Sequence, residues 1–168
     1  MNRRPIFLGV LALIAACTTA ADELWIVRAD GTGPVRVGMT LTEINTTLHE
    51  RFMLPKDKDE QACFYVTPKT QPKAAFMILN GRLGRIDVDK AGVKTSLGIQ
   101  VGDSEKKALE AYGKTLKVGP HKYIDNGHYL TAKSEDVHYG IRFETENGKI
   151  TSFYAGLFEA IQYVEGCE

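Results

Sequence analysis

The stretch Val35-Arg36-Val37-Gly38-Met39-Thr40 has a counterpart 64 residues later, Ile99-Gln100-Val101-Gly102-Asp103-Ser104. Each stretch runs apolar-x-apolar-Gly-x into a hydroxyl residue, and apolar residues then recur at helical spacing. Thr40 and Glu43 form a capping-box pattern, in which each side chain bonds the free backbone N–H of the other residue. The two stretches therefore predict two helices, which begin after Thr40 and Ser104.

Antiparallel strands are expected after each helix. The apolar or alternating runs are residues 62–66, 74–79 and 82–88 in the first half and residues 129–132, 137–144 and 149–155 in the second. Asn80-Gly81 and Asn147-Gly148, which are 67 residues apart, favour tight hairpins because both residues of each pair tolerate positive φ. We therefore expect an α+β fold of two tandem repeats, residues 24–95 and 96–168, each a helix or helical hairpin packed on antiparallel sheet. A chance similarity of two α+β segments is the alternative.

The first of these helix starts also resembles a known motif. Val37-Gly38-Met39-Thr40, with Leu41, Glu43 and Ile44, is similar to the helix start of two related families. One comprises small outer-membrane lipoproteins of the barrel-assembly machinery, of the SmpA/OmlA type. The other comprises the secreted β-lactamase inhibitory proteins, which are tandem repeats of a helical hairpin on an antiparallel sheet. The resemblance implies the fold and a binding surface, but not the inhibitors' target or contact residues.

Residues 1–21 have the build of a secretory signal peptide. Basic Arg3 and Arg4 precede an apolar run from Ile6 to Ala16, which is too short to span a membrane, and small residues follow. Ile14-Ala15-Ala16-Cys17 resembles a lipobox, in which Cys17 is acylated, whereas Thr19-Ala20-Ala21 fits ordinary cleavage before Asp22. We expect a periplasmic protein, anchored in the outer membrane through Cys17 on the first interpretation and soluble or secreted on the second. No membrane contact is expected beyond that anchor.

Composition and cysteine content narrow the class of protein. The chain has 21 basic and 21 acidic residues, so its neutral balance argues against binding of nucleic acid, which normally needs a basic face. Outside the signal segment only Cys63 and Cys167 remain, and an even pair in an exported protein predicts a disulfide. Residues 160–164 alternate in polarity and are expected to form a final strand, which the disulfide ties back to the first repeat.

Histidine and tyrosine are dense in the second half. The sequence places three histidines within eighteen residues, each closely followed by tyrosine: His121, Tyr123, His128, Tyr129, His138 and Tyr139. On adjacent strands these side chains would converge on one sheet face as binding residues. Such residues suit contacts with proteins or glycans, and imidazoles also suit zinc or copper. The third interpretation is that the histidines are ordinary edge or core residues whose ring nitrogens form hydrogen bonds with backbone groups.

The function expected from the sequence is binding without catalysis. Nucleophile elbows, phosphate-binding loops, dinucleotide fingerprints and His-Glu-x-x-His motifs are missing, so we assign no catalytic residue, metal ligand or cofactor. We expect an exported envelope protein that binds another macromolecule, an envelope or secreted protein, through its sheet face. The alternative is a metal-binding protein or small hydrolase that uses the histidine-rich strands. A purely structural role in the envelope is a third class.

Overall fold

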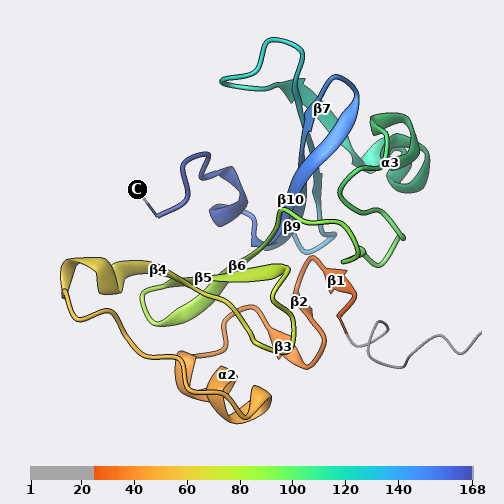
Figure 1. Cartoon of the computed structure of the whole chain (residues 1–168). Helices are drawn as coiled ribbons and strands as arrows, with labels where there is room; N and C mark the ends of the chain where they lie inside the picture. Colours follow the sequence, from red (N-terminus) through yellow and green to blue (C-terminus); the bar gives the residue numbers. More distant parts are fainter. Residues whose placement is uncertain (1–24, 168) are drawn as a thin grey trace, which may run out of the picture.

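An antiparallel sheet of seven strands runs through the computed structural model, which describes residues 25–167 (Figure 1). In spatial order its strands are β4 (Cys63–Val66), β5 (Ala74–Leu79), β6 (Arg82–Val88), β10 (Lys149–Leu157), β9 (Tyr139–Glu146), β8 (His128–Lys133) and β7 (Lys117–Pro120). Both Asn-Gly hairpin turns are confirmed, since all four of their residues have positive φ. The protein is thus a mixed fold with more strand than helix. The expected signal peptide and Cys17 lie outside the described residues.

Two α-helices accompany this sheet within the described residues, α2 (Leu41–Leu48) and α3 (Glu105–Tyr112). The capping box of α2 is confirmed, because Thr40 Oγ1 accepts the Glu43 N–H at 3.2 Å and Glu43 accepts the Thr40 N–H at 2.7 Å. Ser104 caps α3 by accepting the Lys107 N–H at 3.2 Å. In the described part of the chain, no helix has the length and apolar character that crossing a membrane requires.

Short elements that the sequence did not predict complete the architecture. A second sheet is formed by β1 (Val27–Arg28), β2 (Gly31–Thr32) and β3 (Val35–Arg36), whose two-residue strands are too short to show a periodic pattern. Three 3₁₀ turns are η1 (Asp59–Ala62), η2 (Gly113–Thr115) and η3 (Ala160–Gln162).

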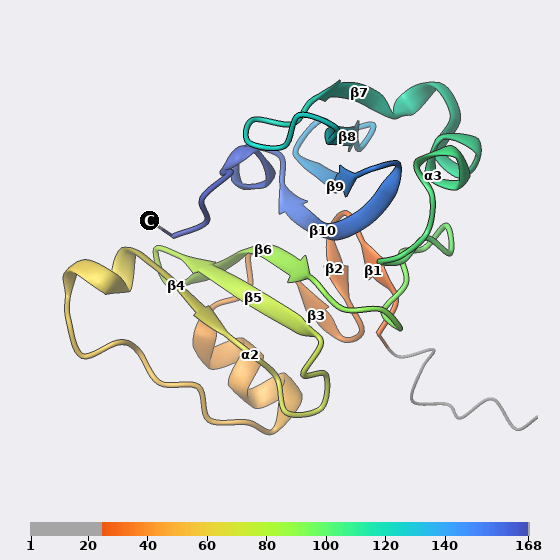
Figure 2. The ribbon, with the colours of Figure 1, turned by 45° about the horizontal axis from the view of Figure 1, so that its top comes forward.

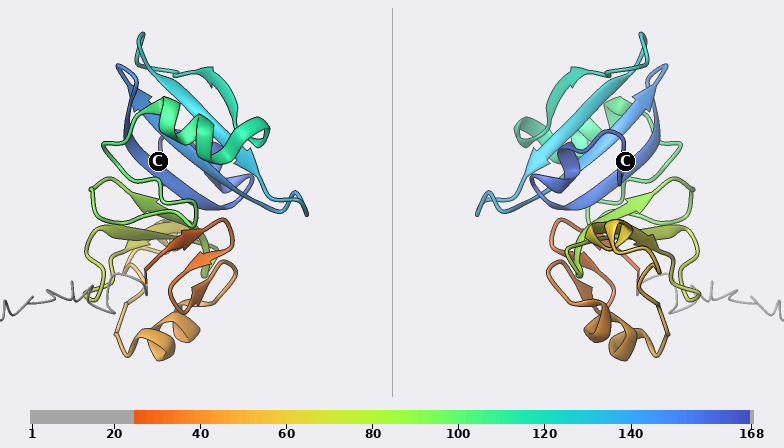
Figure 3. Two further views of the ribbon diagram at one scale, coloured as in Figure 1. Left: turned by 90° about the vertical axis from the view of Figure 1, so that its right-hand side faces the viewer. Right: turned by 90° about the vertical axis from the view of Figure 1, so that its left-hand side faces the viewer.

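Both helices pack on the same face of the large sheet, which we call the helix face. Its core consists of fully buried strand residues such as Phe76, Ile86, Phe143 and Phe153, against which α2 and α3 place apolar side chains. The left view of Figure 3 shows α3 in front of the strands, and the right view shows the C-terminal segment in front of the opposite face. The two sides of the sheet are therefore covered by different parts of the chain.

The start of each helix is tied to the hairpin that follows it, in the same manner in both halves. In the first half Gly38 N–H donates to Leu83 C=O at 2.8 Å, and Leu83 N–H donates to Met39 C=O at 2.8 Å. In the second half Gly102 N–H donates to Ile150 C=O at 2.8 Å, and Ile150 N–H donates to Asp103 C=O at 2.9 Å. These bonds fix the first turn of each helix over the beginning of β6 or β10.

The two hairpins also share an irregularity and pair with each other. One extra residue interrupts each register, Gly84 in β6 and Thr151 in β10, as in a β-bulge. Strands β6 and β10 then pair antiparallel, with Asp87 opposite Tyr154 and Val88 opposite Phe153. This pairing joins the two halves into one continuous, twisted sheet (Figure 2).

The C-terminal segment corrects one expectation and confirms another. The predicted final strand over residues 160–164 is wrong, because η3 lies there instead. Strand β10 already has partners on both sides, so the chain finds no free edge beside it and crosses the sheet face. The predicted disulfide is confirmed: Cys63 opens β4 and bonds Cys167, with 5.3 Å between the Cα atoms. We call residues 158–167 the strap.

Candidate functional site

The sheet face opposite the helices is polar. Side chains alternate along a strand, so the neighbours of core residues point to the other side. There the strands present charged and phenolic groups, and we call this surface the polar face; its central residues are Tyr65, Arg85, Asp87, Arg142, Glu144 and Tyr154. The strap crosses this face (Figure 1).

A buried ion pair lies at the centre of the polar face. Arg85, only 3% exposed, donates from Nε and Nη2 to the two carboxylate oxygens of Asp87, each at 2.7 Å. Its Nη1 donates to the carbonyls of Ala160 and Tyr163 at 3.0 and 2.7 Å, which holds the strap in place. Arg85 is therefore an anchor between the sheet and the strap.

Two tyrosines surround this pair. Tyr65 OH donates to Asp87 at 3.0 Å and accepts from Arg85 at 2.8 Å, and the Arg85 guanidinium lies 4.5 Å from the centre of the Tyr154 ring. Burial, reinforced by the negative charge of Asp87, raises the pKa of Tyr65 to about 12. Burial and the carboxylate of Glu144 raise the pKa of Tyr154 as well. Both phenols stay protonated at neutral pH and serve as fixed donors.

Glu144 organises the part of the polar face in the second half. Its carboxylate accepts from Tyr154 OH and, at 3.2 Å, from Ser152 Oγ. The ring of His121 stacks on Tyr129 at 4.5 Å between centroids and points Nε2 toward Glu144 at 3.7 Å. That distance is too long for a hydrogen bond, so the buried Nε2 has no bonded partner among the described residues.

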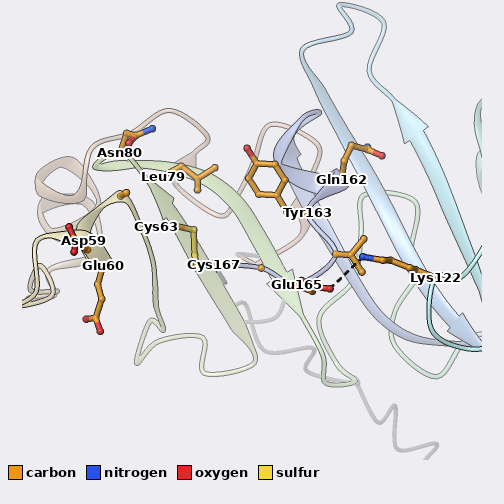
Figure 4. Close-up of a pocket in the computed structure, with 13 residues that line it drawn as sticks. Asp59, Glu60, Cys63, Leu79, Asn80, Lys122, Gln162, Tyr163, Glu165 and Cys167 are labelled. Carbon is orange, nitrogen blue, oxygen red and sulfur yellow. Dashed lines mark hydrogen bonds and ion pairs between the residues drawn. A yellow bond between two sulfur atoms is a disulfide. The ribbon is translucent and has the colours of Figure 1, made fainter.

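Two hollows flank the strap. The larger, of about 870 Å³, opens between η1, the ends of β4 and β5, and the strap. Figure 4 shows it, with Tyr163 between Leu79 and Gln162 and with Lys122 paired to Glu165. The smaller, of about 350 Å³, lies over the centre of the polar face. Residues 164–166 of the strap line both hollows, so the strap separates them.

The predicted histidine–tyrosine cluster does not converge on one face. His121, Tyr123 and Tyr129 do come together, with ring centroids of His121 and Tyr123 6.4 Å apart. His128 lies on the helix face instead, where its Nδ1 is 2.9 Å from Glu105 of α3. The expectation is wrong there because His128 and Tyr129 are adjacent in a strand and must point to opposite faces.

His138 and Tyr139 lie at the hairpin between β8 and β9, away from both groups. The His138 N–H donates to Asp136. The Tyr139 N–H donates to Ser134 Oγ, and the Tyr139 C=O accepts the Ser134 N–H. Within residues 25–167, no group of three or more histidine, cysteine, aspartate or glutamate side chains is placed to hold a metal ion.

Sequence reasoning missed the central residues of the polar face, Arg85, Asp87, Glu144 and Tyr154. A usable signal was present, because two charges interrupt the otherwise apolar run Leu83-Gly84-Arg85-Ile86-Asp87-Val88 at alternate positions. A charged pair inside a strand of the sheet centre indicates a side chain network, since isolated buried charges are unstable.

Comparison with protein-family models, with curated proteins and with solved structures finds no match to this chain. What the polar face does is therefore inferred from its own residues. These residues supply fixed hydrogen-bond donors, acceptors and aromatic rings, which suit recognition of a polar partner.

Proposed function

We propose that the protein is a non-enzymatic, exported envelope protein that binds another macromolecule through its polar face. The observation that supports this proposal is the network around Arg85, Asp87, Tyr65, Tyr154 and Glu144. Hydrogen bonds hold these side chains in place before any partner arrives, so the partly exposed members, Tyr65, Asp87 and Glu144, lose little conformational entropy when a partner contacts them. Arginine and tyrosine are also the residues that interfaces favour.

The size of the surface favours a macromolecule over a small ligand. The hollows on both sides of the strap are open, and both reach the same strap residues. Exposed side chains along them include Tyr163 at 46% and Tyr65 at 39%. A partner that contacts both hollows would bury the strap between them, which requires an extended contact surface. The metal or hydrolase alternative is not proposed, because His121 and His128 lie on opposite faces of the sheet.

We also propose that the two halves are tandem copies of one helix-and-hairpin unit. The bonds from Gly38 and Gly102 to their hairpins support this duplication, and so do the extra residues Gly84 and Thr151. Helix starts differ by 64 positions and bulges by 67, the spacings of the sequence repeat. A duplicated unit is what the resemblance to the tandem inhibitory proteins and the single-unit lipoproteins implies, so we extend that resemblance as a proposal.

Export and anchoring complete the proposed function. The signal segment of residues 1–21 supports transfer to the periplasm, and a disulfide persists in such an oxidising compartment. Acylation of Cys17 would fix the protein to the outer membrane, whereas cleavage before Asp22 would release it. Membrane association that is unchanged by Cys17→Ser would remove the lipid anchor from the proposal.

Photo-cross-linking in cells tests the binding face. A photoreactive amino acid at Tyr163, on the strap, is expected to capture a defined partner. The matched control is Leu109 on α3, which is 37% exposed and belongs to the helix side. Equal capture from both positions, or none from Tyr163, would contradict binding through the polar face.

A further inference from the structure

Most of the charged residues that line the smaller hollow are acidic. Its walls include the carboxylates of Asp87, Asp89, Glu144 and Glu165, against the single guanidinium of Arg85. The charge of Arg85 is already engaged by two bonds to Asp87. At the rim, Glu165 is paired with the exposed Lys122 at 3.5 Å. The hollow therefore carries a surplus of negative charge, which repels anions and attracts cations.

Glu144 has acceptor capacity that the protein leaves unused. A carboxylate offers about four lone-pair sites, and here the hydroxyls of Tyr154 and Ser152 are the bonded donors. No lysine or arginine within the described residues forms an ion pair with it. A half-buried carboxylate with neutral donors alone is a favourable site for a cation that brings its own N–H groups.

The buried imidazole of His121 is an independent sign that this carboxylate is incompletely bonded. Its side chain is 5% exposed, and its Nδ1 accepts the Tyr123 N–H at 3.1 Å, so the proton of the neutral ring is on Nε2. That N–H points at Glu144 across 3.7 Å without bonding it. Leaving a buried donor unpaired is unfavourable, so the arrangement indicates a carboxylate held for another purpose.

An aromatic wall favours a basic side chain over a bare metal ion. The Tyr65 ring is partly exposed beside the hollow, and a guanidinium or ammonium group is attracted to such a ring. The strap adds the apolar Val164 to the lining, against which the methylenes of a long side chain can pack. No described residues are arranged as a metal site.

We propose that the smaller hollow receives an arginine or lysine side chain of a protein partner, with Glu144 as its main acceptor and Tyr65 as its aromatic wall. This inference rests on the proposed binding function and specifies its chemistry. The partner presents a basic residue to the polar face, and the strap borders the site where it enters.

Titration with short peptides tests the cation specificity without knowledge of the partner. Backbone amide signals of the purified, isotope-labelled protein are followed by NMR as acetyl-Gly-Arg-Gly-amide is added. The control peptide replaces arginine with citrulline, which has nearly the same shape and no charge. We expect saturable shifts around Asp87, Ser152 and Glu165, with the arginine peptide binding about tenfold more tightly. Equal binding of both peptides, or shifts spread over all exposed acids, would overturn the proposal.

Glu144→Gln identifies the acceptor. The variant keeps an oxygen for Tyr154 and places an NH2 group where the second oxygen accepts from Ser152, whose hydroxyl can rotate to accept instead. It loses the charge, so we expect about tenfold weaker binding of the arginine peptide. Glu110→Gln on α3 is the control and should bind as the unchanged protein does. Tyr65→Leu is a second variant, expected to weaken binding by a factor of about three. Wild-type affinity in Glu144→Gln would exclude Glu144 as the acceptor and overturn the proposal.

Cross-linking from Tyr163 in the Glu144→Gln background separates this inference from the proposed function. Loss of partner capture supports both. Undiminished capture retains the binding face and overturns the basic side chain as its ligand. If the unchanged protein captures no partner at all, the proposed function fails, and the peptide titration still decides whether the hollow is specific for cations.

Discussion

The two faces of the sheet are built from the same strands and do different work. On the helix face, Phe76, Ile86, Phe143 and Phe153 are fully buried beneath α2 and α3. On the polar face, the residues between them form a network of ions and phenols under a strap of irregular chain. Alternation along each strand thus separates an apolar core from a polar network, residue by residue. The contribution of each face to stability and to binding can be measured by substitution.

Removal of the disulfide is expected to have the largest effect. Cys63 and Cys167 are 104 positions apart, and closing a loop of that size stabilises a fold by about 4.7 kcal/mol in the chain-entropy model. We expect Cys63→Ser with Cys167→Ser to lower the free energy of unfolding by about 4 kcal/mol, as measured by denaturant titration. The strap should then exchange its amide hydrogens faster, while the core strands keep their order of protection. Uniform loss of protection on both faces would show that the faces are not separable.

Phe143→Ala probes the helix face. Phe143 is fully buried and packs against Phe153 and Tyr112, at 5.7 and 5.4 Å between ring centroids. The lost burial and the cavity together should cost about 4 kcal/mol. Peptide binding, measured below the unfolding transition, should stay within a factor of two. A selective loss of peptide binding at preserved stability would contradict the placement of the binding surface on the polar face.

Arg85→Met tests how much the polar face contributes to the stability of the fold. The substitution leaves Asp87 without its cation and removes two donors from the strap carbonyls, so we expect a loss of about 3 kcal/mol. Arg85→Met with Asp87→Leu removes the stranded carboxylate as well and should recover part of this loss. A double variant no more stable than Arg85→Met would show that the ion pair is not the cause.

The tyrosines of the polar face give a smaller effect at alkaline pH. Because the pKa of Tyr65 is raised from 10.0 to about 12, the folded protein holds this proton more tightly than the unfolded chain. Its stabilising contribution is complete below pH 10 and is lost as the pH rises through about 12. Absorbance of tyrosinate should show one late-titrating phenol fewer in Tyr65→Phe. Loss of a phenol that titrates near pH 10 instead would show that Tyr65 is exposed to water.

The sequence predicted those elements whose signals are local. The Asn-Gly turns, the capping box at Thr40 and the strands around them require only neighbouring residues, and the structure has all of them. The cysteine pair was predictable because two thiols leave one pairing. The strand predicted over residues 160–164 does not form, because β10 is already paired on both sides. The alternation of polar and apolar residues in this segment contains no information about that non-local pairing.

The candidate site was harder to predict because it depends on which face each residue occupies. Histidine and tyrosine density suggested one cluster, yet consecutive positions such as His128 and Tyr129 cannot share a face. Arg85 and Glu144 come from strands 59 positions apart in the sequence, and only the pairing of β6 with β10 and of β10 with β9 brings their networks together. No local pattern contains that information.

The pairing of Asp87 with Tyr154 has a consequence for symmetry. On the proposed duplication these two residues are equivalent, since they differ by the 67 positions that separate the hairpins. The pair Val88–Phe153 then corresponds to Ile86–Ala155, so the halves meet as two subunits of a two-fold dimer would, about an axis through Asp87 and Tyr154. In a dimer of identical chains, a residue on that axis faces its own copy. Because the two halves are joined in one chain, the two positions at the axis can hold different residues. The smaller hollow is consequently asymmetric, with an acid on one side of the axis and a phenol on the other.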